Sequence, residues 1–179
     1  MYMKNSIFTF AFFLITLISS LQLTAQNFKD LDKSPMDVAA FPSSYKISNK
    51  TVKVIYSRPQ LNGRDLVKLA PPEMVWRTGA NEAAEITFYK DVIFGGKALK
   101  AGTYSLFTIP SFDGDWTVII NSARNVWGSY YYKQDQDVIR VSGKTSTTEE
   151  NIEAFSMMFD KDMTLKIGWG KTVVSVSIE

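Results

Sequence analysis

Near the C-terminus, residues 155–178 have the sequence FSMMFDKDMTLKIGWGKTVVSVSI. In three successive runs of this stretch, apolar side chains return at every second position. A period of two residues is the pattern of a β-strand with one buried face. The stretch therefore predicts three strands, and the core residues it predicts are Phe155, Met157, Phe159, Leu165, Ile167, Val174 and Val176.

The same alternation appears upstream, in strands predicted at 51–56, 85–89, 91–94, 103–109, 116–120 and 138–142. Turn residues such as Gly95-Gly96 and Asp113-Gly114 separate these segments. A polar connection is expected at 145–149, and a single helical turn at 66–69. The spacing predicts an all-β protein, an antiparallel, jelly-roll-like β-sandwich of roughly eight to ten strands.

The first 25 residues indicate a cleavable secretory signal peptide. Lys4 supplies a positive charge, and an apolar run from Ile7 to about Leu23 leads to the small-residue cleavage site Leu23-Thr24-Ala25. A transmembrane anchor is the alternative. The apolar run is short for that role, and Ser and Thr dilute it.

Three regions follow from this interpretation: a signal peptide at 1–25, a flexible arm at 26–34 and a single β-sandwich domain at 35–179. We expect the protein to be exported, either periplasmic or secreted. We expect no stable membrane anchor after cleavage.

Composition excludes several kinds of chemistry. The 179 residues contain no Cys and no His, which removes disulfides, thiol nucleophiles, imidazole bases and the usual zinc and copper ligands. The net charge is +2, with both signs mixed along the chain, which argues against a nucleic-acid partner. No cofactor and no metal site is predicted.

The most distinctive polar stretch is VWRTGANE, residues 75–82, on a long loop that opens a strand. Arg77, Asn81 and Glu82 offer donors and acceptors suited to a carboxylate or to sugar hydroxyls, and Arg58 follows another strand end. The alternative is a structural clasp, in which Arg77 or Arg58 pairs with Glu82 and Asn81 satisfies loop backbone groups.

An aromatic group accompanies these polar residues. Trp76, Trp127, Tyr130 and Tyr132 would form a platform for the apolar face of a sugar. The alternative is that the tryptophans fill the ends of the sandwich.

Acidic residues give a weaker signal. A glycan hydrolase needs two carboxylates that face each other across a cleft. Four acidic residues are available for such a pair: Glu82, Glu85, Asp135 and Asp137. Asp113-Gly114-Asp115 and Asp135-Gln136-Asp137 each resemble a fragment of a Ca²⁺ loop but lack its other ligands, so we interpret both as turns.

Five segments resemble the exported bacterial family catalogued as domain of unknown function 2911. They are YSRP (56–59), VWRTGANE (75–82), AGTYSLF (101–107), WTVI (116–119) and WGSY (127–130). The resemblance extends from about Ser34 to the C-terminus. It implies a secreted or periplasmic β domain of Bacteroidetes-type bacteria, and it implies no activity.

Three functional hypotheses remain open. The first is non-catalytic binding of a small molecule, a glycan or an envelope partner. The second is a carboxylate-dependent glycan hydrolase, and the third is a purely structural envelope protein. The predicted ligand-binding residues are Arg58, Trp76, Arg77, Asn81, Glu82, Trp127 and Tyr130.

Overall fold

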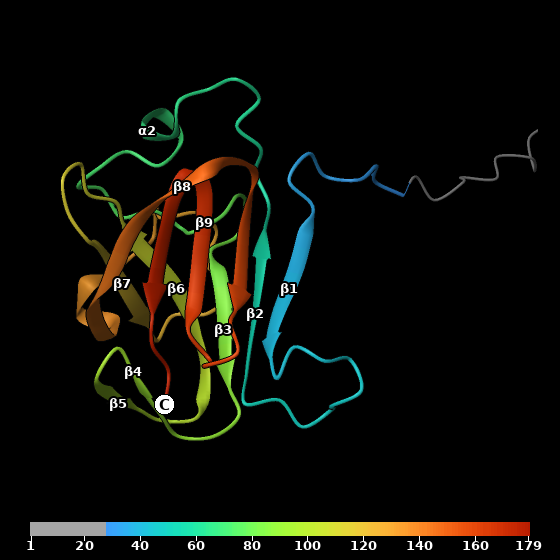
Figure 1. Cartoon of the computed structure of the whole chain (residues 1–179), viewed down its shortest axis with the longest axis vertical. Coiled ribbons are helices and arrows are strands. Elements are labelled where there is room, and N and C mark those ends of the chain that lie inside the picture. The colour runs from blue at the N-terminus through green and yellow to red at the C-terminus, as the bar shows by residue number, and fades with distance from the viewer. Residues whose placement is uncertain (1–27) are drawn as a thin grey trace, which may run out of the picture. The chain divides into compact units, whose positions relative to one another are not determined.

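A computed structural model describes residues 28–179, so the predicted signal peptide and its cleavage site lie outside the described residues. Residues Asp32–Glu179 form one compact unit. Its strands are β1 Met36–Phe41, β2 Val52–Ser57, β3 Ala84–Phe88, β4 Val92–Phe94, β5 Lys97–Leu99, β6 Gly102–Ile109, β7 Trp116–Asn121, β8 Asp137–Phe159 and β9 Leu165–Val176 (Figure 1). The helices of this region are the single turn α2 Leu66–Leu69 and the 3₁₀ turn Gln134–Gln136. Within residues 28–179 no helix is long and apolar enough to cross a membrane.

Seven strands form one antiparallel sheet in the order β1-β2-β3-β6-β7-β8-β9, and β4 and β5 form a separate hairpin. The predicted antiparallel, all-β fold is therefore confirmed. Neighbours in the sheet follow the order of the chain, so the connectivity is a meander, without the crossing connections of a jelly roll. The proline-bounded strand β1 lies at one edge of the sheet, where a strand flanked by proline is tolerated.

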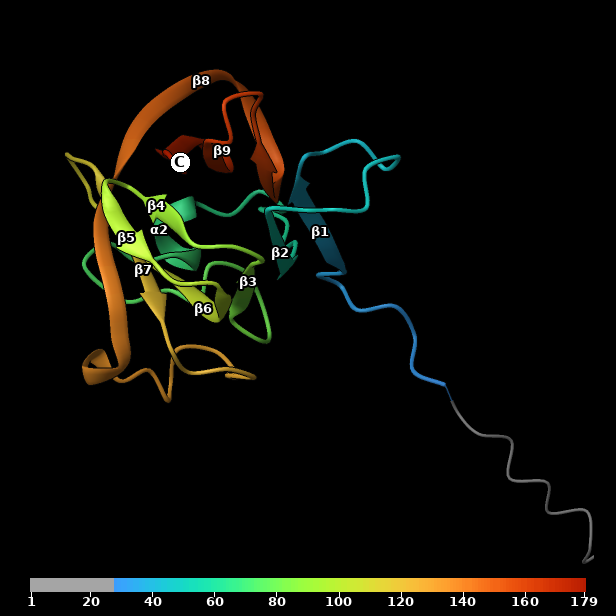
Figure 2. The ribbon, with the colours of Figure 1, turned by 90° about the horizontal axis from the view of Figure 1, so that it is seen from below.

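Strand β8 carries the chain from one layer to the other. Its first part pairs with β7, ending at Gly143 opposite Trp116, and its remainder pairs with β9 from Lys144 onward. Figure 2 shows β8 arching from beside β7 across to β9. A Cβ atom on Gly143 would come within 2.5 Å of the Val174 side chain, so only glycine fits at this corner without displacement of its neighbours.

The sheet also curls back toward its first strands. The Phe155 N–H donates to the Pro59 carbonyl at 2.9 Å, and the Leu61 N–H donates to the Glu153 carbonyl at 3.0 Å. These bonds join the segment after β2 to the second half of β8. The curled sheet thus encloses a core between two facing layers.

The segment Thr145–Glu149 corrects one prediction, because it is part of β8 and not a connection. Its threonines are β-branched and suit an extended backbone, and Thr145 and Thr147 pair with Val174 and Thr172 of β9. The last two predicted strands are likewise one strand, β9, interrupted by Gly170 in the left-handed region at φ +60°.

Two apolar clusters lie on the two faces of the sheet. The larger fills the space between the layers and contains all seven core residues predicted from the end of the chain. The smaller lies on the outer face and consists of Ala83, Phe107 and Ile119. The smaller cluster is covered by Val126 and Tyr132, so the loop after β7 is held against the outer face.

Candidate functional site

The loop after β7 folds back over the outer face because two of its side chains, Val126 and Tyr132, are partly buried there. The Tyr132 ring packs edge-on against Phe107, with ring centroids 5.2 Å apart. The backbone adds two hydrogen bonds to the end of the VWRTGANE stretch and the residue after it: Ala83 N–H donates to the Val126 carbonyl at 2.8 Å, and Gly128 N–H donates to the Asn81 carbonyl at 2.9 Å. These contacts bring residues 81–83 and 126–128 together.

A compact polar network fixes the end of the same loop. One oxygen of Asp137 accepts from the Tyr132 hydroxyl and from Arg140 Nε, both at 2.6 Å, and its other oxygen accepts from Asn121 Nδ2 at 2.8 Å. Burial and the hydrogen bond to Asp137 raise the pKa of the Tyr132 phenol. Asp137, one of the acids considered for catalysis, is thus engaged in holding the loop.

Three aromatic side chains project from this fixed loop into solvent. Trp127 is 54% exposed, Tyr130 80% and Tyr131 74%. Trp127 forms an isolated backbone bridge with Glu82, which is also exposed. We call Trp127, Tyr130 and Tyr131, with Asn81 and Glu82 beside them, the aromatic surface.

Trp76 lies elsewhere. It is 5% exposed and packs between the layers, against Phe155, Trp116 and Trp169. A tryptophan packed in this way does not present a face to a ligand at the surface. Of the two tryptophans singled out from the sequence, the structure therefore places only Trp127 on the aromatic surface.

Arg58 is tied into the framework. It forms an ion pair with Asp37 of β1 at 3.0 Å, and it donates to the Phe155 carbonyl at 3.0 Å and to Ser156 Oγ at 2.7 Å. Arg58 thus joins the edge of the sheet to the second half of β8.

Arg77 does not form the predicted clasp. The ion pairs found among residues 28–179 do not include a pair between Glu82 and either arginine, so that form of the clasp is wrong. The loop is instead closed by the Ala84 N–H, which donates to the Arg77 carbonyl at 3.1 Å. Within the described region, Arg77 Nε is buried and has no hydrogen-bond partner.

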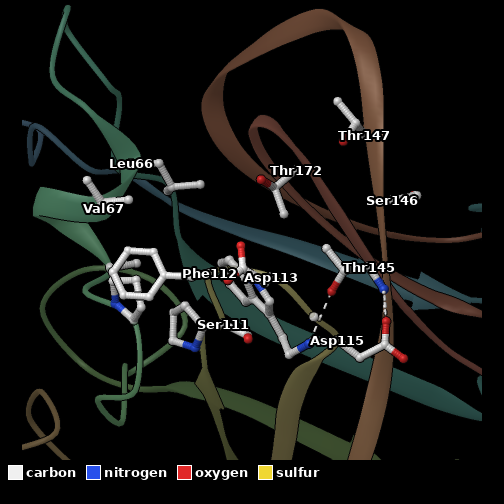
Figure 3. A pocket seen from close by; sticks show the side chains of 15 residues that line it. Leu66, Val67, Ser111, Phe112, Asp113, Asp115, Thr145, Ser146, Thr147 and Thr172 are labelled. Atoms are coloured by element: carbon white, nitrogen blue, oxygen red, sulfur yellow. Dashed lines mark hydrogen bonds between the residues drawn. The ribbon is translucent and has the colours of Figure 1, made fainter.

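A cleft of about 560 Å³ lies near α2, at the other end of β7 from the aromatic loop. We call it the α2 cleft (Figure 3). The six residues of β7 separate the two regions by roughly 17 Å at the usual rise per residue. The lining residues are Leu66, Val67, Ala70, Pro72, Pro110, Ser111, Phe112, Asp113, Gly114, Asp115, Trp116, Thr145, Ser146, Thr147 and Thr172.

Sequence reasoning missed the α2 cleft because its walls come from four separate parts of the chain: 66–72, 110–116, 145–147 and Thr172. The sequence predicts only a turn at Asp113-Gly114-Asp115 and only a polar connection at 145–149. The Asp115 carboxylate accepts hydrogen bonds from Thr145 N–H at 2.8 Å and from Ser142 Oγ at 3.1 Å, which attach this turn to β8. The cluster of two prolines and a one-turn helix near residue 70 was the available signal, since it marks a constrained loop.

The other acidic candidates do not gather. Glu85 Oε1 accepts from the Asn125 N–H at 2.7 Å, and Asp135 lies in the exposed 3₁₀ turn. Over residues 28–179, no group of three or more His, Cys, Asp or Glu side chains is arranged to hold a metal ion.

Comparison with known proteins gives a family and nothing finer. No curated protein and no solved structure matches the chain. The model of one family, described as protein of unknown function (DUF2911), matches residues 34–178. That match covers most of the 179 residues, and the chain belongs to the DUF2911 family of proteins of unknown function.

Proposed function

We propose that this protein is an exported, non-catalytic binding domain that holds a glycan on the aromatic surface. The observation that carries the proposal is the exposure of Trp127, Tyr130 and Tyr131 on a loop whose backbone is fixed. Exposed aromatic side chains gathered in one place commonly mark an interaction site. Their flat apolar faces match the apolar face of a sugar ring.

The neighbouring polar groups suit the hydroxyls of such a ligand. Asn81 offers an amide donor and acceptor, and Glu82 offers acceptor oxygens. Because the loop is already anchored through Val126, Tyr132 and Asp137, little conformational entropy is lost when a ligand binds.

The test is a glycan-array screen with the mature protein, followed by calorimetric titration of the best ligand. Trp127→Ala and Tyr130→Ala should each weaken binding at least about tenfold, which is about 1.4 kcal/mol. Tyr45→Ala is the matched control, since Tyr45 is 90% exposed but lies in the connection between β1 and β2. Unchanged affinity in both surface variants would remove the aromatic surface from the function.

The same experiment separates the two alternatives. A glycan hydrolase would release shortened products, which chromatography of the titrated ligand detects. A structural envelope protein would bind no glycan in the screen. Recovery of the intact ligand from a saturable complex is the result expected for a binding protein.

Export is tested separately, on protein recovered from the producing cell. We expect mass spectrometry to find Gln26 at the mature N-terminus, because small residues precede it at Leu23-Thr24-Ala25. Retention of residues 1–25 in the exported fraction would contradict the proposal of a cleaved signal peptide.

A further inference from the structure

The α2 cleft has the dimensions of a small-molecule site and is separate from the aromatic surface. Its volume of about 560 Å³ falls within the usual range of roughly 300–1,000 Å³ for such sites. We infer that it is a second binding site, which takes a small organic cation with an apolar body, such as an alkylamine. The inference does not depend on the proposed glycan site, which uses other residues.

The two sides of the α2 cleft differ in chemistry. Phe112 and Val67 lie on one side, and Asp115 and Thr145 lie on the other (Figure 3). Trp116 also lines the cleft, but it is only 5% exposed, so the accessible aromatic face is that of Phe112. A ligand that fills this space needs an apolar part for the first side and polar hydrogen-bonding groups for the second.

The lining carries negative charge without a positive partner. Its fifteen residues, all in the described part of the chain, include two carboxylates and no Lys or Arg. Asp115 accepts only from the neutral groups of Thr145 and Ser142. Asp113 is exposed and has no hydrogen bond or ion pair to any of residues 28–179.

Several aspartates of the domain have a cationic partner that the two cleft aspartates lack, although Asp135 and Asp162 also have none among residues 28–179. Asp37, Asp91, Asp137 and Asp160 each lie within ion-pair distance of an Arg or Lys. The two carboxylates of the α2 cleft therefore leave a local negative potential, which attracts a cation and repels an anion.

The small number of carboxylate ligands in the cleft favours an organic cation over a metal ion. Calcium takes about six to eight oxygen ligands, and two carboxylates on one short turn supply too few. An ammonium group needs one carboxylate and gains further attraction from an aromatic face. Asp113 and the adjacent Phe112 provide that pair, since Phe112 is 73% exposed and lines the same cleft.

The test compares three ligands of equal length by calorimetric titration of the mature protein: hexylammonium, hexanol and hexanoate. We expect hexylammonium to bind at least tenfold more tightly than hexanol, and hexanoate not to bind. Asp113→Asn should reduce hexylammonium affinity about tenfold and remove the preference over hexanol. Phe112→Ala should weaken hexylammonium and hexanol alike.

Asp162→Asn is the matched control, because Asp162 is an exposed acid on a turn outside the α2 cleft. Amide chemical shifts locate the ligand and should move at Thr145, Thr147 and Thr172. Equal binding of hexanol and hexylammonium would overturn the inference, as would an Asp113→Asn variant with unchanged affinity. Calcium that competes with hexylammonium would assign the carboxylates to a metal ion instead.

Discussion

The indole of Trp76 stacks on the indole of Trp169, with ring centroids 5.4 Å apart and planes inclined by 14°. Trp76 precedes β3 on a loop, whereas Trp169 lies in β9, so the stack joins the two layers of the curled sheet. Phe155 of β8 packs edge-on against both rings. Trp76, in the VWRTGANE stretch, is therefore part of the core.

Because Trp76 is buried and Trp127 is exposed, replacing each with alanine should change the free energy of unfolding by very different amounts. Trp76→Ala should lower the free energy of unfolding by about 3–5 kcal/mol, because it removes a large buried side chain and leaves a cavity. Trp127→Ala should change it by less than about 0.5 kcal/mol, because Trp127 is 54% exposed. Chemical denaturation of the two variants checks both values, and equal losses would show that Trp127 also supports the fold.

The contrast shows why the sequence predicted the fold better than the site. The alternation of apolar residues in 155–178 depends only on local spacing, and all its predicted core residues are buried. Trp76 and Trp127 carry the same chemistry in similar polar contexts, and only long-range packing distinguishes them. The α2 cleft depends on four segments meeting in space, which no local spacing encodes.

The corner at Gly143 gives the second prediction. A Cβ atom there would lie 2.5 Å from Val174 and 2.7 Å from Val118, so Gly143→Ala must push β8 away from its neighbours. Overpacking of this kind costs about 1–3 kcal/mol. The control Lys144→Ala, at the exposed next position, should leave the denaturation midpoint nearly unchanged. A neutral Gly143→Ala variant would mean that the corner is looser than its geometry indicates.

Tyr56 gives a prediction for alkaline pH. Burial raises the pKa of its phenol above the ordinary value of 10.0, although the hydrogen bond with Met157 opposes that change. Since the folded state holds the proton more tightly than the unfolded state, this stability is fully present below pH 10. It is lost as the pH rises from 10 through the higher folded pKa.

The measurement is the free energy of unfolding of the wild type and of Tyr56→Phe between pH 8 and 12. We expect the wild type to lose more stability over this range than the variant, whose phenyl ring cannot ionise. Ultraviolet titration counts the tyrosines that ionise only above the ordinary pKa. We expect this number to be smaller by one in Tyr56→Phe than in the wild type. Parallel stability curves would contradict the raised pKa.

Arg77 gives the last prediction. Its Nε is buried without a hydrogen-bond partner in the described region, and an unsatisfied buried donor costs about 1–3 kcal/mol. Arg77→Met keeps much of the side-chain length and removes that donor, so the free energy of unfolding should stay the same or rise. Arg58→Met should instead lower it by about 1–3 kcal/mol, because it breaks the bonds to Asp37, Phe155 and Ser156. Denaturant midpoints of the two variants test the contrast between an arginine that holds the fold together and one that does not.

If Arg77→Met lowers the free energy of unfolding as much as Arg58→Met does, the guanidinium of Arg77 stabilises the fold. If Arg77→Met raises the free energy of unfolding and also weakens glycan binding, Arg77 serves the ligand at the expense of stability.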